Sequence, residues 1–460
     1  MNCKKIVAAA GVAALLGSGC QTMPGSEPEA DYVAGTLIRF TGESASPNGA
    51  WCWFQDERVI VNTHDANDPM LMFTAVSASL SDEQEQGDLD FYWYGLSSEQ
   101  GGVVELHDRL GQDDHNVAAL FQLPSGQTLA AYARHNKDTT TYSRLSVQGN
   151  PAEWSEVSEY EGEAKSTYNN LRTAGADKTL LNFSRLQGWD PNFLIYDDHR
   201  QSFAYGGRLL NSEGRPYLNY VGSRDGTKIH VVATDQHPRN FDNSIYHGVT
   251  DGRALFDTHG NIVDNDLSDQ DAVEPTELTV VFKGDADNVA WMADVEIDDG
   301  DQPVIAFSVQ KDGRGLAQGS GGFDHRYHLA RLGPDGWQHH EIAYAGERLY
   351  PREDDYTGLV AIDPEDVNHL VISTNAEPVS GVALISSADQ QRHYEIFEGK
   401  SSDGGKTFTW QALTRNSTVD NIRPIIPAWN SDQRVVLWMR GSYTTYTDFD
   451  TQIVGVIQAR

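Results

Sequence analysis

Two histidines, His115 and His135, have a spacing that could serve proton transfer. They flank two apolar runs, residues 117–123 and 128–133, whose separation by the turn sequence Pro-Ser-Gly-Gln predicts a β-hairpin. Each histidine lies ten residues from Ser125. An antiparallel pairing centred there would place them opposite each other, with Cβ atoms about 5 Å apart. Two imidazoles so placed could act on one ligand; the alternative is a pair of solvated histidines at strand ends.

The next two expected hairpins repeat this geometry. Residues 168–185 would place Tyr168 opposite Arg185, and Tyr217 would lie opposite Thr234. Taking the proton from carbon 5 of a uronic acid requires a base, a cation for its carboxylate, and an acid for the departing O4. Imidazole, guanidinium and phenol supply these groups. If the hairpin ends converge, they form an active site. Otherwise Tyr168 is an aromatic residue at the core edge and Arg185 is a partner for surface acids.

Hairpins of this kind continue along the whole chain. Seven are expected, at residues 51–77, 115–135, 168–185, 217–234, 289–308, 356–375 and 423–440. Further strand pairs lie between them, 42 Gly are present, and no long amphipathic helical period follows the N-terminus. This organisation predicts an all-β protein, a seven-bladed β-propeller in which the inner strands direct their ends to one face. Two unrelated β-sandwiches are the alternative.

The N-terminus has the pattern of an export signal. Residues 1–20 contain two lysines, a short apolar run and small residues before Cys20. Their end resembles a bacterial lipoprotein signal, which would be cleaved to leave a lipidated Cys20. Residues 21–34 would form a flexible tether, and residues 35–460 a single propeller. We therefore expect an outer-membrane lipoprotein, or a secreted protein if Cys20 is not acylated, with no other membrane contact.

The net charge and the number of cysteines limit which ligands the protein can bind and whether it can form disulfide bonds. The formal net charge is −33, so the surface would repel nucleic acid and favour solubility in a saline habitat. A polyanionic ligand could bind only in a locally basic cleft. After loss of Cys3 and lipidation of Cys20, only Cys52 remains as a free thiol, so no intramolecular disulfide is expected. We expect a monomer.

Several segments together resemble a known family. The segment SSDGGKTF at 401–408 matches the Asp-box of sialidase-type propellers, a structural hairpin tip. The chain resembles the BNR-repeat propellers in several segments and in their order. These segments are AWCWFQDERV, DHNVAAL, TYNNLR with LLNFSR, RPYLNYVGSRDGTKIHVVATDQHPRN with SIYHG, RYHLARL with GWQHHEIAYAG, and DDYTGLVAIDPEDVNHLVISTN. That group includes the ulvan lyases of polysaccharide lyase families 24 and 25. The similarity extends over residues 51–440 and is greater to family 25.

The resemblance implies β-elimination in ulvan, the sulfated rhamnose and uronic acid polymer of green algae, to a 4,5-unsaturated uronate. It implies His115 as principal base or acid, His135 as its companion, Tyr168 as the catalytic tyrosine and Arg185 as carboxylate neutraliser. The remaining residues implied are those of the sugar subsites, namely Asn116, Tyr217, Tyr220 and Tyr246.

No cofactor is needed for this chemistry. Some propellers of this group hold a structural zinc through histidines and a cysteine. His328 and His339 would share a face of one hairpin with His247 as a third ligand, but no cysteine accompanies them. Calcium is the other structural ion considered, because the chain has many acidic loops that could supply oxygen ligands.

Two other functions remain compatible with a propeller. A sialidase or other glycoside hydrolase would need an arginine cluster or two acids that flank a glycosidic bond. A non-catalytic glycan-binding propeller would keep Arg185 and the tyrosines without needing His115.

Overall fold

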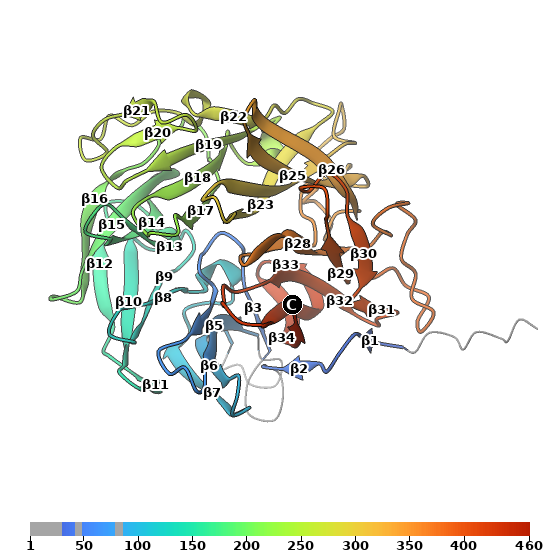
Figure 1. Ribbon diagram of the computed structural model, residues 1–460, viewed down its shortest axis with the longest axis horizontal. Helices are drawn as coiled ribbons and strands as arrows, with labels where there is room; N and C mark the ends of the chain where they lie inside the picture. The colour runs from blue at the N-terminus through green and yellow to red at the C-terminus, as the bar shows by residue number, and fades with distance from the viewer. Residues whose placement is uncertain (1–29, 42–47, 79–85) are drawn as a thin grey trace, which may run out of the picture.

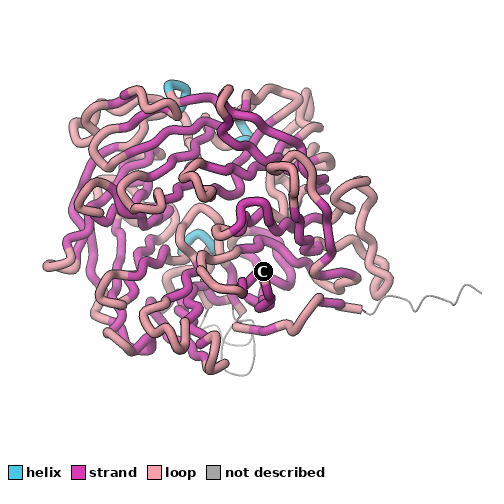
Figure 2. The backbone as a smooth tube through the Cα atoms, in the orientation of Figure 1, coloured by secondary structure: helices cyan, strands magenta, loops and turns pink. Residues whose placement is uncertain are grey.

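The computed structural model describes residues 30–41, 48–78 and 86–460. Its sheets surround a central axis as the seven blades of a β-propeller (Figure 1). Apart from strands and loops, Figure 2 shows only short helical turns, the 3-10 helices η1 (Asp114–Asn116), η2 (Pro238–Asn240) and η3 (Pro275–Glu277). The predicted all-β propeller is confirmed. None of the helices in the described ranges is long and apolar enough to cross a membrane, and the expected signal with Cys20 lies outside those ranges.

Each blade is an antiparallel sheet. Blade 1 contains β3 (Gly49–Ala50), β4 (Val59–Asn62), β5 (Met70–Ser77), β6 (Leu89–Gly95) and β7 (Gly101–His107). Blade 2 contains β8 (Ala119–Gln122), β9 (Thr128–Ala133), β10 (Thr140–Val147), β11 (Asn150–Trp154) and β12 (Ser158–Glu161). Blade 3 contains β13 (Thr167–Ala174), β14 (Thr179–Gln187), β15 (Asp190–Asp197) and β16 (Ser202–Arg208).

The pattern continues around the ring. Blade 4 contains β17 (Leu218–Gly222), β18 (Ile229–Thr234), β19 (Ile245–Thr250), β20 (Leu255–Asp257), β21 (Ile262–Asp264) and β22 (Thr279–Phe282). Blade 5 contains β23 (Val289–Ile297), β24 (Pro303–Gln310), β25 (His325–Gly333) and β26 (Gly336–Gly346). Blade 6 contains β27 (Val360–Asp363), β28 (Asp366–Thr374), β29 (Glu395–Lys400) and β30 (Thr409–Ala412). The Asp-box forms the turn between β29 and β30, as predicted, where the Asp403 side chain accepts from the Lys406 and Thr407 backbone N–H groups.

The N-terminal strand closes the ring. Blade 7 contains β32 (Asp420–Ile425), β33 (Gln433–Thr445), β34 (Asp448–Ala459) and, at its outer edge, β2 (Ile38–Arg39). The pairing of Ile38 with Gly455 joins the two ends of the chain. Ahead of it, β1 (Tyr32–Val33) pairs with β31 (Thr414–Arg415). Closure in this way leaves no gap between first and last blades.

The first strands of the blades line the axis. Strand β13 contacts β8 on one side and β17 on the other, and β23, β27 and β32 continue the series. Six of the seven predicted hairpins correspond to the first two strands of a blade, and the first corresponds to β4 and β5, which follow the short strand β3. We call the face at which each first strand begins and each second strand ends the top face. Residues that flank these strands therefore meet there although they are far apart in sequence.

An aromatic segment, residues 51–57, fills the middle of the ring. The predicted first hairpin included it, but the strand pairing begins only at Val59. The Trp53 ring packs edge-on to the Trp291 ring at 5.3 Å between centroids, and the Phe54 ring lies 4.6 Å from that of Tyr217. Seven inner strands leave a central gap that aromatic side chains fill at native packing density. This central plug links the core to the top face.

The plug supplies the first testable consequence. Phe54→Ala should lower the free energy of unfolding by about 3–5 kcal/mol, because it removes a buried ring between several others. Urea unfolding of the purified protein measures this. Phe241→Ala is the matched control, since the Phe241 side chain is 43% exposed. Equal losses for the two variants would show that the plug does not stabilise the ring.

Candidate active site

Blades 2 and 3 bring His115, His135, Tyr168 and Arg185 together at the top face. The β8–β9 hairpin is centred on Ser125, as predicted. Its strand pairing ends before the histidines, because His115 belongs to η1 and His135 follows β9. The two imidazole rings nevertheless stack, with centroids 4.1 Å apart. The Tyr168 ring lies 5.7 Å from that of His115.

One carboxylate holds both imidazoles. Oδ1 of Asp113 lies 2.7 Å from Nδ1 of His115, and its Oδ2 lies 2.8 Å from Nδ1 of His135. Asp113 also caps η1 by accepting from the His115 backbone N–H. Asn116 fixes the second histidine, because its Oδ1 accepts from the His135 backbone N–H while its Nδ2 donates to the Gly111 carbonyl. With Nδ1 occupied in both rings, each Nε2 is left for a substrate.

The two imidazoles differ in pKa. Burial alone would lower the pKa of His115, but the surrounding groups that can carry negative charge outweigh burial and raise that pKa well above its ordinary value. In order of decreasing effect these groups are Cys52, Tyr168, Asp113 and Asp114. Burial lowers the pKa of His135, and the nearby charge of His115 lowers it further. Near neutral pH the site therefore holds a charged His115 beside a neutral His135. Such a split is the signature of an acid and base pair.

A second carboxylate supports this arrangement from below. Asp114 is fully buried and accepts hydrogen bonds from the Arg423 guanidinium and the Tyr443 hydroxyl. Its Oδ1 lies 3.0 Å from Nδ1 of His115. The buried thiol of Cys52 belongs to the same cluster, and the Cys52 backbone N–H donates to the Asp114 carbonyl. Blade 7 thus fixes η1 through an ion pair that lies inside the protein.

Tyr168 and Arg185 meet, although the predicted register was wrong by one residue. Arg185 pairs with Thr167, and the register shifts between Thr167 and Asn170. Tyr168 lies in this irregularity with φ +57°, which turns its side chain toward the axis. The Arg185 guanidinium carbon lies 4.9 Å from the Tyr168 ring centroid and 4.5 Å from that of Tyr217. Bulges often redirect side chains in this way at functional sites.

Arg185 has no carboxylate partner in the described part of the chain. One guanidinium nitrogen donates to the Pro216 carbonyl at 2.5 Å, and no ion pair joins it to any described acid. The Tyr168 hydroxyl likewise makes no hydrogen bond within those residues. A buried cation without an acidic partner, beside a phenol without a hydrogen bond in the described residues, is suited to an anionic substrate with an exchangeable proton.

Two aromatic neighbours were not foreseen from the sequence. The Tyr446 ring, from the β33–β34 turn, stands edge-on to His115 at 5.1 Å and to His135 at 6.0 Å. The His237 ring packs against Tyr217 at 5.4 Å. A hairpin tip in blade 7 gives no sequence signal for a position over blade 2. Asp113, by contrast, was visible as the acid two residues before His115.

Some expected sugar-binding residues lie elsewhere. Tyr217 is in place, and its backbone pairs with Thr234 as predicted. Tyr220 lies deeper, stacked on Phe183 at 4.6 Å between ring centroids. Tyr246 is buried in the third strand of blade 4 and donates its hydroxyl to Asp235. Asn116 is engaged through both amide atoms, by the His135 backbone N–H and the Gly111 carbonyl.

The three histidines considered for zinc are not brought together. His328 and His339 share a face of blade 5, with ring centroids 5.9 Å apart. His247 belongs to blade 4, where its Nε2 lies 3.1 Å from Nδ1 of His230. Within the described ranges, three groups could hold a metal ion, namely Cys52 with Asp114 and His115, Asp113 with His115 and His135, and Asp88 with Glu105 and Asp108. None contains the expected zinc ligands.

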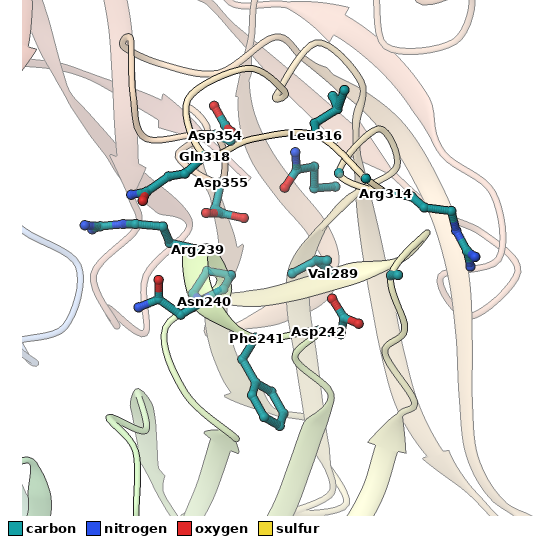
Figure 3. Close-up of a pocket in the computed structure, with 15 residues that line it drawn as sticks. Arg239, Asn240, Phe241, Asp242, Val289, Arg314, Leu316, Gln318, Asp354 and Asp355 are labelled. Carbon is teal, nitrogen blue, oxygen red and sulfur yellow. The ribbon is translucent and has the colours of Figure 1, made fainter.

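A separate hollow of about 440 Å³ lies on the top face between η2, β23 and the loop after β24 (Figure 3). Figure 3 shows Arg239, Gln318 and Asp355 around it. Asp354 accepts from backbone N–H groups of the loop and pairs with Arg348. The hollow contains acids, among them Asp355, whose pKa burial raises to about 7. It lacks the paired imidazoles, the phenol and the arginine without an acidic partner that meet at the histidine site.

Comparisons with known proteins agree with the fold. The model of a family described as BNR repeat-containing family members matches residues 75–345, so the chain belongs to this BNR repeat-containing family. No curated protein matches it in sequence.

Two solved structures resemble the chain over most of its length. One is an ulvan lyase of polysaccharide lyase family 25 bound to -[GlcA(1-4)Rha3S]-, at a TM-score of 0.63 and 13% identity, over 91% of this chain and 95% of that one. The other is polysaccharide lyase Uly1, at 0.57 and 10% identity, over 91% and 93%. At these identities the likeness establishes the fold and leaves the reaction to be argued from the site.

Asp113→Asn tests the shared carboxylate. The pKa of His115 should fall, because the variant removes a negative charge at 2.7 Å from its Nδ1. Nuclear magnetic resonance titration of the histidine ring protons measures the change. Asp108→Asn, which alters an exposed carboxylate of the neighbouring blade, is the control. An unchanged His115 titration would mean that Asp113 does not set its charge.

Proposed function

We propose that this protein is a polysaccharide lyase that cleaves a uronate-containing polymer by β-elimination, with ulvan as its substrate. The observation that carries the proposal is one carboxylate shared by two imidazoles of opposite pKa shift, beside an arginine that no described acid neutralises. Elimination from a uronate needs this combination, since the carbon acid becomes reactive only when its carboxylate charge is offset. The likeness in fold to two polysaccharide lyases supports the same class.

In the proposed reaction Arg185 binds the uronate carboxylate. Nε2 of the neutral His135 takes the proton from carbon 5, and the electron pair forms the C4–C5 double bond while the C4–O4 bond breaks. The charged His115 donates through Nε2–H toward the carboxylate, where negative charge develops. Tyr168 delivers its hydroxyl proton to O4. The two halves of the polymer then leave, one with a protonated O4 and the other with the C4–C5 double bond. Proton transfer from His135 to the tyrosinate through solvent restores both groups.

The protonation states fit these roles. Burial and the neighbouring Tyr217 raise the pKa of Tyr168 well above its ordinary value, so the phenol stays protonated until it acts. The charges of His115 and Arg185 act in the opposite direction and would stabilise the tyrosinate that forms. A base that is neutral and an acid that is protonated at the same pH is the state that general acid–base catalysis requires.

Ulvan as substrate rests on charge and on the family 25 likeness. The chain has a net charge of −33, so a polyanion can approach only where arginines lack acidic partners, as Arg185 does. The family 25 structure holds a fragment with one uronate and one sulfated rhamnose. We also propose that the protein is exported, either acylated at Cys20 or secreted, because the polymer is extracellular. In this proposal it acts as a monomer without a catalytic metal.

A glycoside hydrolase fits the site less well. Hydrolysis would need two acids free to flank the scissile bond. Asp113 is engaged by both imidazoles and Asp114 by Arg423 and Tyr443. A non-catalytic glycan-binding propeller would need Arg185 and the aromatic rings but not an acid and base pair.

Product analysis separates these functions. Incubation with ulvan should generate the ultraviolet absorbance of a 4,5-unsaturated uronate, whereas heparin, alginate and pectin should give less or none. His135→Ala and Tyr168→Phe should each lower kcat by about 10²–10⁴-fold, the usual contribution of a general acid or base. His259→Ala, at an exposed turn of blade 4, is the control and should keep full activity. New reducing ends without the absorbance would identify a hydrolase, and binding without any product would identify a glycan-binding protein.

The rate of elimination should depend on pH in two steps. His135 must be neutral, and its pKa lies below the ordinary 6.5, so kcat should rise with pH and level off before about 6.5. His115 must be charged, and its pKa lies above 6.5, so kcat should fall at a higher pH. Initial rates across the pH range measure both limbs. His115→Gln should remove the alkaline limb, and an alkaline limb unchanged in that variant would contradict the assignment.

A further inference from the structure

A second cation stands beside the proposed carboxylate site. Arg215 lies in the loop between β16 and β17, and its guanidinium carbon is 5.3 Å from the Trp189 ring and 5.8 Å from the Tyr217 ring. Arg185 faces the same two rings, at 5.6 Å and 4.5 Å. The two guanidinium groups therefore contact the same two aromatic rings, those of Trp189 and Tyr217.

The Arg215 guanidinium makes no ion pair or hydrogen bond within the described ranges, although it lies beside the aromatic rings that Arg185 also faces. Comparable arginines near the top face are neutralised. Arg239 pairs with Glu353 at 2.9 Å and Arg348 with Asp354 at 2.7 Å. Two neighbouring guanidinium groups that no acid contacts directly repel each other, although the charges of Glu353 and Asp190 act on Arg215 and Arg185 from further away. In a chain with 67 acidic residues to draw on, that arrangement favours an anionic ligand.

Trp189 adds an independent observation. It occupies the two-residue connection between β14 and β15, after Gly188, whose φ is +62°. The indole is 38% exposed, although a tight turn usually carries small polar residues. An exposed aromatic face beside a cation is suited to a sugar ring with a charged substituent. The indole also holds Arg215 in place by a cation–π contact.

We propose that Trp189 and Arg215 form a second anion subsite, which binds an oxyanion on the sugar next to the uronate held by Arg185. The inference rests on the proposed polysaccharide function and adds a specificity determinant to it. The two guanidinium groups flank one aromatic ring, so they fit anionic groups on adjacent units of a single chain. The oxyanion is a sulfate ester or a second carboxylate, because a planar guanidinium group can donate two hydrogen bonds to either anion. Neither Trp189 nor Arg215 takes part in proton transfer.

Arg215→Gln tests the subsite, because loss of a binding group should change KM and leave kcat nearly unchanged. On sulfated ulvan the KM should rise by about tenfold or more, as expected for loss of a charge-assisted hydrogen bond, while kcat stays within about twofold. Arg200→Gln, with a side chain 82% exposed in the same blade, makes the same charge change and should alter neither. Arg215→Lys keeps the charge without the fork and should give an intermediate KM. Near-ultraviolet circular dichroism verifies that each variant is folded.

Chemically desulfated ulvan distinguishes the two sources of the anion. If the Arg215→Gln effect disappears on the desulfated polymer, the subsite binds sulfate; if it persists in full, the subsite binds a second carboxylate. Both results support the proposal. An unchanged KM on both polymers would overturn it while leaving the lyase function intact.

Calorimetric binding of sulfated ulvan oligosaccharides separates failure of the subsite from failure of the lyase function. Loss of affinity in Arg215→Gln without any turnover by the unaltered protein would support the subsite and refute the lyase. Equal affinity of Arg215→Gln and the unaltered protein would overturn the subsite whatever the reaction.

Discussion

The site depends on one carboxylate, Asp113, that accepts from two imidazoles. A buried carboxylate is costly unless it is fully hydrogen-bonded, and both oxygens here have nitrogen partners within 2.8 Å. Burial would raise its pKa, but the two imidazoles hold that pKa well below its usual value. The same contacts point both Nε2 atoms away from the carboxylate. A single anion therefore orients the two groups that would exchange protons with a substrate and is one of several groups that set their charge.

The rest of the fold keeps this anion where it is. Asp113 caps η1, and the buried pair of Asp114 with Arg423 ties η1 to blade 7. The ion pair of Asp114 with Arg423 joins blades that are distant in sequence. Removing either partner would leave an uncompensated buried charge. On the other side, Tyr168 and Tyr217 rest on Phe54 of the central plug. Proton-transfer groups and plug thus form one continuous packed layer across the axis.

Much of the architecture could be predicted because it follows from local patterns. Seven hairpins were visible as paired apolar runs with turn residues, and the centre of the β8–β9 hairpin was correct. The meeting of His115 with His135 followed from that symmetry. Where a pattern is broken, prediction from symmetry fails. The bulge at Tyr168 shifts Arg185 by one residue, and residues 51–57 form a plug because the ring has a central gap that only the assembled fold creates.

Long-range features of the site were beyond local reasoning. Tyr446 reaches the histidines from a turn more than 300 residues later in the chain. Trp189 and Arg215 are close because adjacent blades place their loops side by side. The histidines at 247, 328 and 339 illustrate the converse: the family resemblance suggested a zinc site there, and His328 and His339 do share a face, but His247 lies in another blade. Asp113 was missed for a different reason. It lies two residues before His115 in the sequence, but its hydrogen bond to His135 depends on the folded structure.

The central claim is that one carboxylate holds a charged and a neutral imidazole side by side. Neutron diffraction from deuterated crystals grown near neutral pH observes this directly, because it locates each hydrogen on the two rings. The account predicts deuterium on both nitrogens of His115 and on Nδ1 alone of His135. Two rings in the same protonation state, or a bare Nδ1 facing Asp113, would contradict it.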